Sequence, residues 1–351
     1  MRAKGCWPVF LMGLFFSIFL VSPDISRAEE EKTAKLIEGA KKEGAMVFYT
    51  AMNVDDSNMM LKGFEKQYPF IRTKLFRLGS SQLLIKMLAE KRAGMFNCDV
   101  TCNNIFEFDV KIKEGVLAKY ISPEAQAIPE LFKDPVGYWA SLYLQPFGIS
   151  YNTKLVSPQD APKGYADLLN PRWKGKMSLD RGDESWLAGI FHIMGEAKGL
   201  EYAKKLAEQN INFRSGHTLL LQMLLAGEFS IDINSHLQRA ERYRSTGAPI
   251  DWVAPEPTLV SYNPIGITAH APHPNAARLF VDFALSREGQ RIVRDIGRPP
   301  ARADVEPIYP RLAKFAKGDI KVVPISIKWA ERYNEFNRQF EAIFLKKKAK
   351  T

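Results

Sequence analysis

The chain has 351 residues with a formal net charge of +10, 46% hydrophobic and 25% charged residues, and three cysteines. This length is sufficient for two domains, because a single hydrophobic core usually stops growing beyond about 250–300 residues. The balance of apolar and charged residues excludes a disordered chain, and three cysteines are too few to hold so long a chain together as a disulfide scaffold.

Residues 1–28 are typical of an export signal peptide. Arg2 and Lys4 precede an apolar run over residues 7–21, and small residues stand at the two positions that determine cleavage. We expect cleavage after Ala28, since the run is short for a membrane span and no second long apolar segment follows. The mature protein is therefore predicted to be periplasmic, with no membrane insertion once the signal has been removed.

The positive charge bears on the partner of the protein. Four lysines close to the carboxyl terminus are typical of a solvated chain end. An exported protein seldom meets nucleic acid, so we expect no nucleic-acid partner. The remaining excess of positive charge favours attraction of a small anionic solute.

Cys98 and Cys102 lie in an apolar stretch that is predicted to be a strand. In a strand their α-carbons would be about 13 Å apart, at roughly 3.3 Å per residue, which is too far for a disulfide. No histidine is close to them in the sequence. We therefore expect two buried thiols and no metal site.

Short apolar runs alternate with helical periodicity in the first part of the chain, which indicates an α/β fold. Helices are predicted over residues 32–43, 58–68, 80–92 and 104–114, and strands over 46–50, 73–78 and 98–102. In open α/β sheets, ligands bind at loops that follow the carboxyl ends of strands. The polar residues of these loops are the candidate ligand contacts Thr50, Asn53, Ser80, Ser81, Gln82, Asn103 and Asn104.

One of these loops has two interpretations. Ser80, Ser81 and Gln82 begin a predicted helix, whose free N–H groups and positive dipole end could face an anion. An ordinary helix N-cap would have the same sequence.

A second region begins near Phe147 and repeats the alternation. Strands are predicted over residues 177–179, 229–233 and 259–269, and helices from residue 186, before Gly227 and over 274–285. Near the carboxyl terminus an aromatic stripe is typical of a helix packing face, and its members are Trp329, Tyr333, Phe336, Phe340 and Phe344.

The motifs of several enzyme classes are missing from the sequence. It contains no nucleophile elbow, Gly-rich phosphate loop, Cys-x-x-Cys pair or His-Glu-x-x-His zinc helix. We therefore predict a binding protein with no catalytic residues, no cofactor and no resident metal. The enzymatic alternative would pair His236 with Asp232, without an evident third partner.

Several stretches match a known family in the order in which they occur along the chain. They are residues 47–50, 81–84, 99–100, 173–176, 227–228, 261–262, 276–283, 286–290 and 302–305. In this order the sequence resembles the periplasmic solute-binding proteins of ABC importers, in the type 2 binding-protein fold and in the group that includes ferric-ion-binding proteins.

This resemblance implies two α/β lobes joined by a hinge of crossing strands, with an interlobe ligand cleft that closes by hinge motion. We place the crossings near residues 145–148 and 261–266. The first lobe would then comprise residues 29–146 plus 263–351, and the second lobe residues 147–262.

Iron binding is implied less well by the same resemblance. The ferric members hold iron partly through two neighbouring tyrosines, after the strand that follows a Gly-Glu turn. Here that place is Ile233-Asn234-Ser235-His236-Leu237, and the first-lobe ligand positions fall near Asn53 and at Asn103. Amides are poor ligands for a hard ferric ion, so ferric binding is kept as the alternative function.

The expected solute is a small carboxylated or phosphorylated organic anion, with a zwitterion or a polyamine left open. Arg181 could contact a carboxylate or phosphate through two hydrogen bonds, although Asp183 and Glu184 compete for it. The other contacts expected from this part of the chain are Ser185, Asn234, His236 and Tyr262. The resemblance further implies a monomer that delivers the solute to ABC permease and ATPase subunits. A subunit that feeds a membrane sensor would have an identical sequence pattern.

Overall fold

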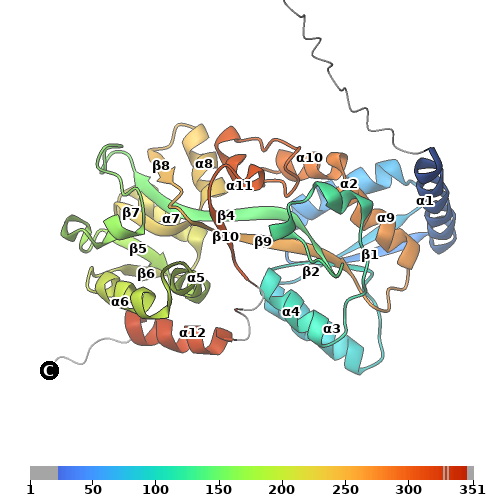
Figure 1. Cartoon of the computed structure of the whole chain (residues 1–351), viewed down its shortest axis with the longest axis horizontal. Helices are drawn as coiled ribbons and strands as arrows, with labels where there is room; N and C mark the ends of the chain where they lie inside the picture. Colours follow the sequence, from blue (N-terminus) through green and yellow to red (C-terminus); the bar gives the residue numbers. More distant parts are fainter. Residues whose placement is uncertain (1–22, 327–328, 330–331, 346–351) are drawn as a thin grey trace, which may run out of the picture.

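The computed structural model describes residues 23–326, 329 and 332–345 (Figure 1). It begins with α1 (Pro23–Glu43), and the predicted cleavage position after Ala28 falls within this helix. The apolar run of the predicted signal lies outside the described residues. Within those residues, no helix has the length and apolar character needed to cross a membrane.

The first part of the chain forms the predicted βα units. Its elements are β1 (Ala45–Thr50), α2 (Val54–Gln67), β2 (Arg72–Arg77), α3 (Ser80–Arg92), β3 (Val100–Cys102) and α4 (Ile105–Lys113). β1 pairs in parallel with both β2 and β3. Cys98 and Cys102 are buried free thiols, as predicted.

The middle of the chain forms a second set of parallel strands with helices. Its elements are β5 (Met177–Asp180), α5 (Glu184–Met194), α6 (Glu196–Ala207), β6 (Asn212–Arg214), α7 (His217–Ala226), β7 (Ile231–His236), α8 (Leu237–Ser245) and β8 (Ile250–Val253). β5 pairs in parallel with β6 and β7. Seven of the eleven residues of α5 are buried, which agrees with its apolar sequence.

Two long strands, β4 (Ala140–Asn152) and β9 (Thr258–Ile267), join the two halves of the fold (Figure 1). The sheet order is β2-β1-β3-β9-β4-β7-β5-β6, with β8 on β4 and β10 (Val322–Pro324) on β9. β4 pairs with β9 as far as Pro146, and from Phe147 onward it pairs with β7. This change of partner falls within the crossing predicted at residues 145–148, and the mixed α/β fold has the predicted two-lobed form with crossing strands.

Further helices complete the fold. They are α9 (Pro274–Leu285), α10 (Arg287–Asp295), α11 (Lys314–Lys317) and α12 (Tyr333–Phe340), and one π-helical segment (Glu341–Leu345) follows α12. Short 3-10 helices cover Pro123–Ala127, Glu130–Phe132, Tyr165–Leu169, Pro171–Trp173 and Pro310–Leu312. α9 packs against α1 and begins where Glu43 accepts the backbone N–H groups of Asn275 and Ala276.

The carboxyl-terminal segment does not lie where the predicted division places it. That division assigns all residues after 262 to the first lobe, but α12 packs against α5 of the second half (Figure 1). The ring centroids of Phe336 and Phe191 are 6.1 Å apart, and those of Phe340 and Phe213 are 6.2 Å apart. Within the described side chains of the aromatic stripe, Phe336, Phe340 and Phe344 form a packing face, as predicted, against the apolar surface of α5 and β6. The other boundaries of the division stay a prediction.

Candidate ligand-binding site

A cleft of about 490 Å³ lies where the two halves of the fold meet. Its lining comes from the loop after β1, from the crossing strand β4, from the end of β7, from α8 and from the segment after α10. The lining residues are Asn53, Asp56, Gln145, Thr218, His236, Gln238, Arg239, Arg242, Tyr243, Ile296, Gly297 and Arg298. The cleft therefore has walls from both lobes and a crossing strand at its base.

The side chain of Gln145 connects the base of the cleft to one wall. Its Nε2 lies 2.9 Å from Nδ1 of His236, and its Oε1 accepts a 3.4 Å hydrogen bond from Nδ2 of Asn263. Gln145 belongs to β4, Asn263 to β9 and His236 to β7. One amide thus links both crossing strands to the second lobe.

Three arginines and one carboxylate give the cleft a net positive charge. Arg298 donates to Oδ2 of Asp56 at 2.8 Å, and its guanidinium lies over the ring of Tyr143. No described carboxylate pairs with Arg239 or Arg242. Burial and the neighbouring charge of Arg298 lower the pKa of Arg239, which indicates that like charges crowd this space. An anion between these groups would relieve the repulsion.

Two histidines form the inner wall on the second-lobe side. The rings of His217 and His236 are 4.3 Å apart, and the ring of Phe147 is 4.9 Å from that of His236. Burial lowers the pKa of both histidines, and the charge of His217 adds to the fall for His236. His236 therefore offers the cleft a neutral ring, which can form a hydrogen bond without adding charge.

Buried carboxyl groups lie behind this wall. Oδ1 of Asp183 is 3.5 Å from Nε2 of His217, and Asp232 accepts a 3.0 Å hydrogen bond from Ser178. Burial raises the pKa of Asp232 to about 7 and that of Asp183 well above its usual value. These acids do not belong to the cleft lining.

The predicted contacts from the first lobe have different surroundings. Asn53 lines the cleft, where its Oδ1 also caps α2 by accepting the N–H of Asp56 at 2.8 Å. The hydroxyl of Thr50 is buried and donates to the carbonyl of Cys102 at 2.8 Å, which holds the ends of β1 and β3 together.

The loops that precede α3 and α4 lie beside each other. Oγ of Ser80 accepts the N–H of Asn104 at 3.4 Å, and Oγ of Ser81 is 3.4 Å from Glu107. Gln82 is exposed. These side chains are absent from the described cleft lining, and their role as ligand contacts stays a prediction.

Asn103 holds a buried lysine. Its Oδ1 accepts Nζ of Lys111 at 2.5 Å, and the hydroxyl of Thr101 is 2.8 Å from the same Nζ. Burial lowers the pKa of Lys111 to about 8. The amide oxygen of Asn103 is thus committed to a structural contact.

The predicted contacts from the second part of the chain are also spread apart. His236 lines the cleft, whereas Arg181 is exposed on the loop after β5 and Ser185 is half-buried in α5. Asn234 is buried in β7. The ring of Tyr262 is packed 5.3 Å from that of Trp139 and does not line the cleft. Of the twelve predicted contacts, the structure brings Asn53 and His236 together in the cleft.

The cationic residues of the cleft were not among the predicted contacts. Arg239 and Arg242 are in α8, which follows the carboxyl end of β7. The rule that selected loops after strands in the first lobe would have selected this position as well. Arg298 lies between α10 and the following loop, and no local pattern distinguishes it from a surface arginine.

Two α/β lobes, two crossing strands and a polar, cationic cleft between the lobes define a two-lobed binding protein. Residues 107–320 match the family described as "Bacterial extracellular solute-binding protein". The match spans more than half of the chain, and the chain belongs to this family. The family membership confirms the prediction of a solute-binding protein of the transport type.

The names of individual relatives refer to different solutes. The chain is 27% identical, over 65% of its length and 69% of the relative's, to a putative 2-aminoethylphosphonate-binding periplasmic protein of Salmonella typhimurium. It is similar to the structure of the periplasmic binding protein AfuA from Actinobacillus pleuropneumoniae with fructose-6-phosphate bound, with 25% identity, a TM-score of 0.70 and coverage of 86% and 98% of the two chains.

A third comparison concerns an iron-binding relative. The fold is similar to that of a Trichodesmium protein (IdiA, FutA) in complex with iron and citrate, with 21% identity, a TM-score of 0.73 and coverage of 86% and 100%. At this identity the likeness extends to the fold alone.

Proposed function

We propose that this protein is the periplasmic solute-binding component of an ABC importer, and that it captures a small phosphorylated, phosphonylated or carboxylated organic anion in the interlobe cleft. The observation that carries this proposal is the excess of positive charge in the cleft, where three arginines face one carboxylate. The protein would reach the periplasm through its cleavable signal peptide and pass the solute to permease and ATPase subunits as a monomer.

The arrangement of the arginines suits a phosphoryl or phosphonyl group. Arg239 comes from the second lobe and Arg298 from the first, so one anion could be held from both sides. Guanidinium groups bind such oxyanions through paired, charge-assisted hydrogen bonds. An anion shared by the two lobes would bind the closed form more tightly than the open form, and would therefore favour hinge closure.

Two relatives support this class of solute. The Salmonella relative is named for 2-aminoethylphosphonate, and the Actinobacillus structure holds fructose-6-phosphate. Both solutes combine an anionic phosphorus group with a polar body. Thr218, neutral His236 and Gln238 could form hydrogen bonds with such a body.

Ferric iron is a weaker candidate for this cleft. The described lining contains a single tyrosine, Tyr243, and a single carboxylate, Asp56. Asp56 already forms an ion pair with Arg298. Ferric iron favours anionic oxygen ligands, and three guanidinium groups would repel a trivalent cation.

We also propose that the cleft carries out no reaction. In the enzymatic alternative His236 would act as a base with Asp232. His236 instead contacts Gln145 and the tilted ring of His217, while Asp232 accepts a hydrogen bond from Ser178 behind the wall. This geometry leaves the pair without direct contact to a nucleophile in the cleft.

A thermal-shift and calorimetry panel on ligand-stripped mature protein tests the proposal. Inorganic phosphate, 2-aminoethylphosphonate, fructose 6-phosphate and ferric citrate are the probes. A solute at 100 times its Kd stabilises the folded protein by about 2.7 kcal/mol, which gives a readily measured rise in Tm. We expect a phosphorus-containing organic anion to give this rise. Saturable ferric binding with a tyrosinate colour, or no response to any anion, would overturn the proposal.

A further inference from the structure

The helix α8 has two opposite faces. Four of its side chains line the interlobe cleft, and they are Gln238, Arg239, Arg242 and Tyr243. At 3.6 residues per turn these four positions fall within about 140° of the helix circumference. The opposite side carries three buried residues, which are Leu237, Ala240 and Glu241. The rotation of α8 about its own axis therefore determines where the cleft arginines stand.

Glu241 is the charged residue of the buried face. Its Oε2 accepts hydrogen bonds from Nε1 of Trp252 at 2.6 Å and from Arg311 at 3.1 Å, and both of its oxygens accept from Arg244 at 2.9 Å. Burial opposes the charge, but the hydrogen bonds from Arg244 and Trp252 and the charge of Arg311 lower the pKa of Glu241. Apolar packing has no preferred direction, whereas these hydrogen bonds are directional. Glu241 therefore restricts the rotation of α8.

Arg311 joins Glu241 to the strand β8. It lies in the short helix Pro310–Leu312. Its guanidinium donates to Oδ1 of Asp251 at 2.7 Å and to the carbonyl of Trp252 at 3.2 Å, and it lies 4.1 Å from the ring centroid of Trp252. Both of these partners belong to β8, which pairs with the crossing strand β4. Arg311 thus ties α8 to a strand that the crossing strand holds in place.

The segment that ends at Arg311 also carries a residue of the opposite cleft wall. Arg298, at its other end, lines the cleft and pairs with Asp56 of α2. Neither Glu241 nor Arg311 belongs to the described lining, so neither would touch a solute in the cleft.

We propose that Glu241 and Arg311 are positioning residues for anion binding: their ion pair fixes the rotation of α8 and thereby holds Arg239 and Arg242 toward the cleft. This inference rests on the proposed anion-binding function. Groups that bind a ligand have to be held within roughly 0.5 Å or 10–20° of the productive geometry, and the buried face of α8 supplies that support.

Arg311→Met tests the inference, with inorganic phosphate and fructose 6-phosphate as the probes. Calorimetry on the full mature protein should show a Kd raised about tenfold, which is the lower limit for losing one hydrogen bond to a charged group. The measurement is made well below the Tm of each variant, so that a loss of stability does not appear as a loss of affinity.

A double variant separates positioning from a general structural effect. If Arg311 acts through the arginines of α8, its replacement should matter less once one of them has been removed. Adding Arg311→Met to Arg239→Gln should therefore raise the Kd further by no more than about threefold. Trp252→Phe removes the indole donor to Glu241 and keeps an aromatic ring, and it should weaken binding in the same direction if Arg311→Met folds poorly.

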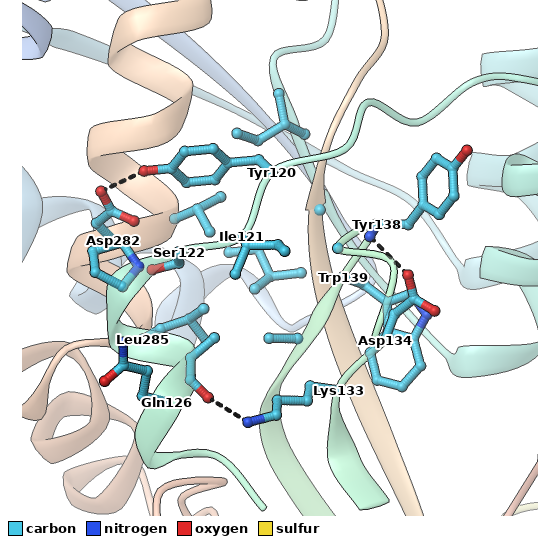
Figure 2. A pocket seen from close by; sticks show the side chains of 18 of the residues that line it. Tyr120, Ile121, Ser122, Gln126, Lys133, Asp134, Tyr138, Trp139, Asp282 and Leu285 are labelled. Carbon is cyan, nitrogen blue, oxygen red and sulfur yellow. Dashed lines mark hydrogen bonds between the residues drawn. The ribbon is translucent and has the colours of Figure 1, made fainter. Parts of the chain in front are cut away.

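Lys133→Met is the matched control. Lys133 lines a separate cavity of about 430 Å³ in the first lobe, which shares no residue with the interlobe cleft (Figure 2). Its Nζ lies 2.8 Å from Oε1 of Glu130 and donates to the carbonyl of Ala125 at 3.1 Å, so it too joins a carboxylate to a backbone carbonyl. This variant should lower the Tm but leave the Kd within about twofold of the unmodified value.

The outcomes distinguish this inference from the proposed function. Unchanged affinity in Arg311→Met and Trp252→Phe would overturn the inference and leave the proposed function intact. An equal loss of affinity in Lys133→Met, or fully additive losses in the double variant, would do the same. Failure of the unmodified protein to bind either probe would count against the proposed function itself, and the inference would fall with it.

Discussion

Replacing Arg239 with glutamine should weaken anion binding without destabilising the protein. Arg239 lines the cleft from α8, and no described carboxylate pairs with it. A hydrogen bond to a charged group contributes about 1.5–3 kcal/mol, so the variant should bind the anion about 10–150-fold more weakly.

Stability should respond differently from affinity. Arg298 and Arg242 repel the Arg239 guanidinium in the free protein, and burial adds to the cost of its charge. No carboxylate loses an ion-pair partner when that charge is removed. The free energy of unfolding should therefore stay within about 0.5 kcal/mol of the unmodified value, or rise slightly.

Isothermal titration calorimetry with the anion that responds in the panel measures this effect, at low and at high salt. The salt dependence should be smaller in the variant, because one charge has been removed from the site. Arg181→Gln is a matched control, since Arg181 is exposed and does not line the cleft. Its Kd should change by no more than about twofold. Equal losses in the two variants, or unchanged affinity in Arg239→Gln, would refute the assignment of the cleft charges.

Three further predictions concern stability. Lys111 is buried with a pKa lowered to about 8 from 10.5, so between these pH values the folded state binds fewer protons than the unfolded state, and stability should rise with pH by up to about 1.4 kcal/mol per unit. Urea unfolding at pH 8, 9 and 10 should show a smaller rise in Lys111→Met, and an equal rise would contradict this account. Asp99 accepts two backbone N–H groups and Nδ1 of His273, so Asp99→Ala should lower the free energy of unfolding by about 3 kcal/mol, and a loss below 1 kcal/mol would count against these bonds. Gly289→Ala would place a methyl group against the carbonyl of Phe283 and should cost about 1–3 kcal/mol, measured as a fall in Tm.

Local sequence signals predicted many elements well. Ser80–Arg92 and Pro274–Leu285 form helices with the predicted bounds, because each is delimited by nearby residues that favour helix starts or stops. The strand predicted over residues 229–233 instead runs from Ile231 to His236. Its extension pairs with β4, with His236 opposite Phe147, and this long-range contact leaves no trace in the local sequence.

The cleft was harder to predict than the fold. α8 has a polar sequence with several charges, which resembles an ordinary solvated helix. Its arginines gain a role in the cleft because Arg298, from a distant part of the chain, lies near Arg239. The rule that ligands bind at loops after the carboxyl ends of strands identifies the edge of the sheet where a ligand binds. The charges that meet at this edge depend on how the two lobes are placed.

The contact between α12 and α5 affects the order in which the protein folds. The elements of the second half from β5 to β8 are encoded before residue 254, but the aromatic side chains of α5 and β6 gain the cover of α12 only when residues 333–345 have been made. A growing chain therefore keeps apolar surface open while α9 and α10 are synthesised. Exposed apolar surface of this kind is what chaperones bind. If the proposed signal peptide directs the chain across a membrane before it folds, this delay would help to keep the second half in an export-competent state.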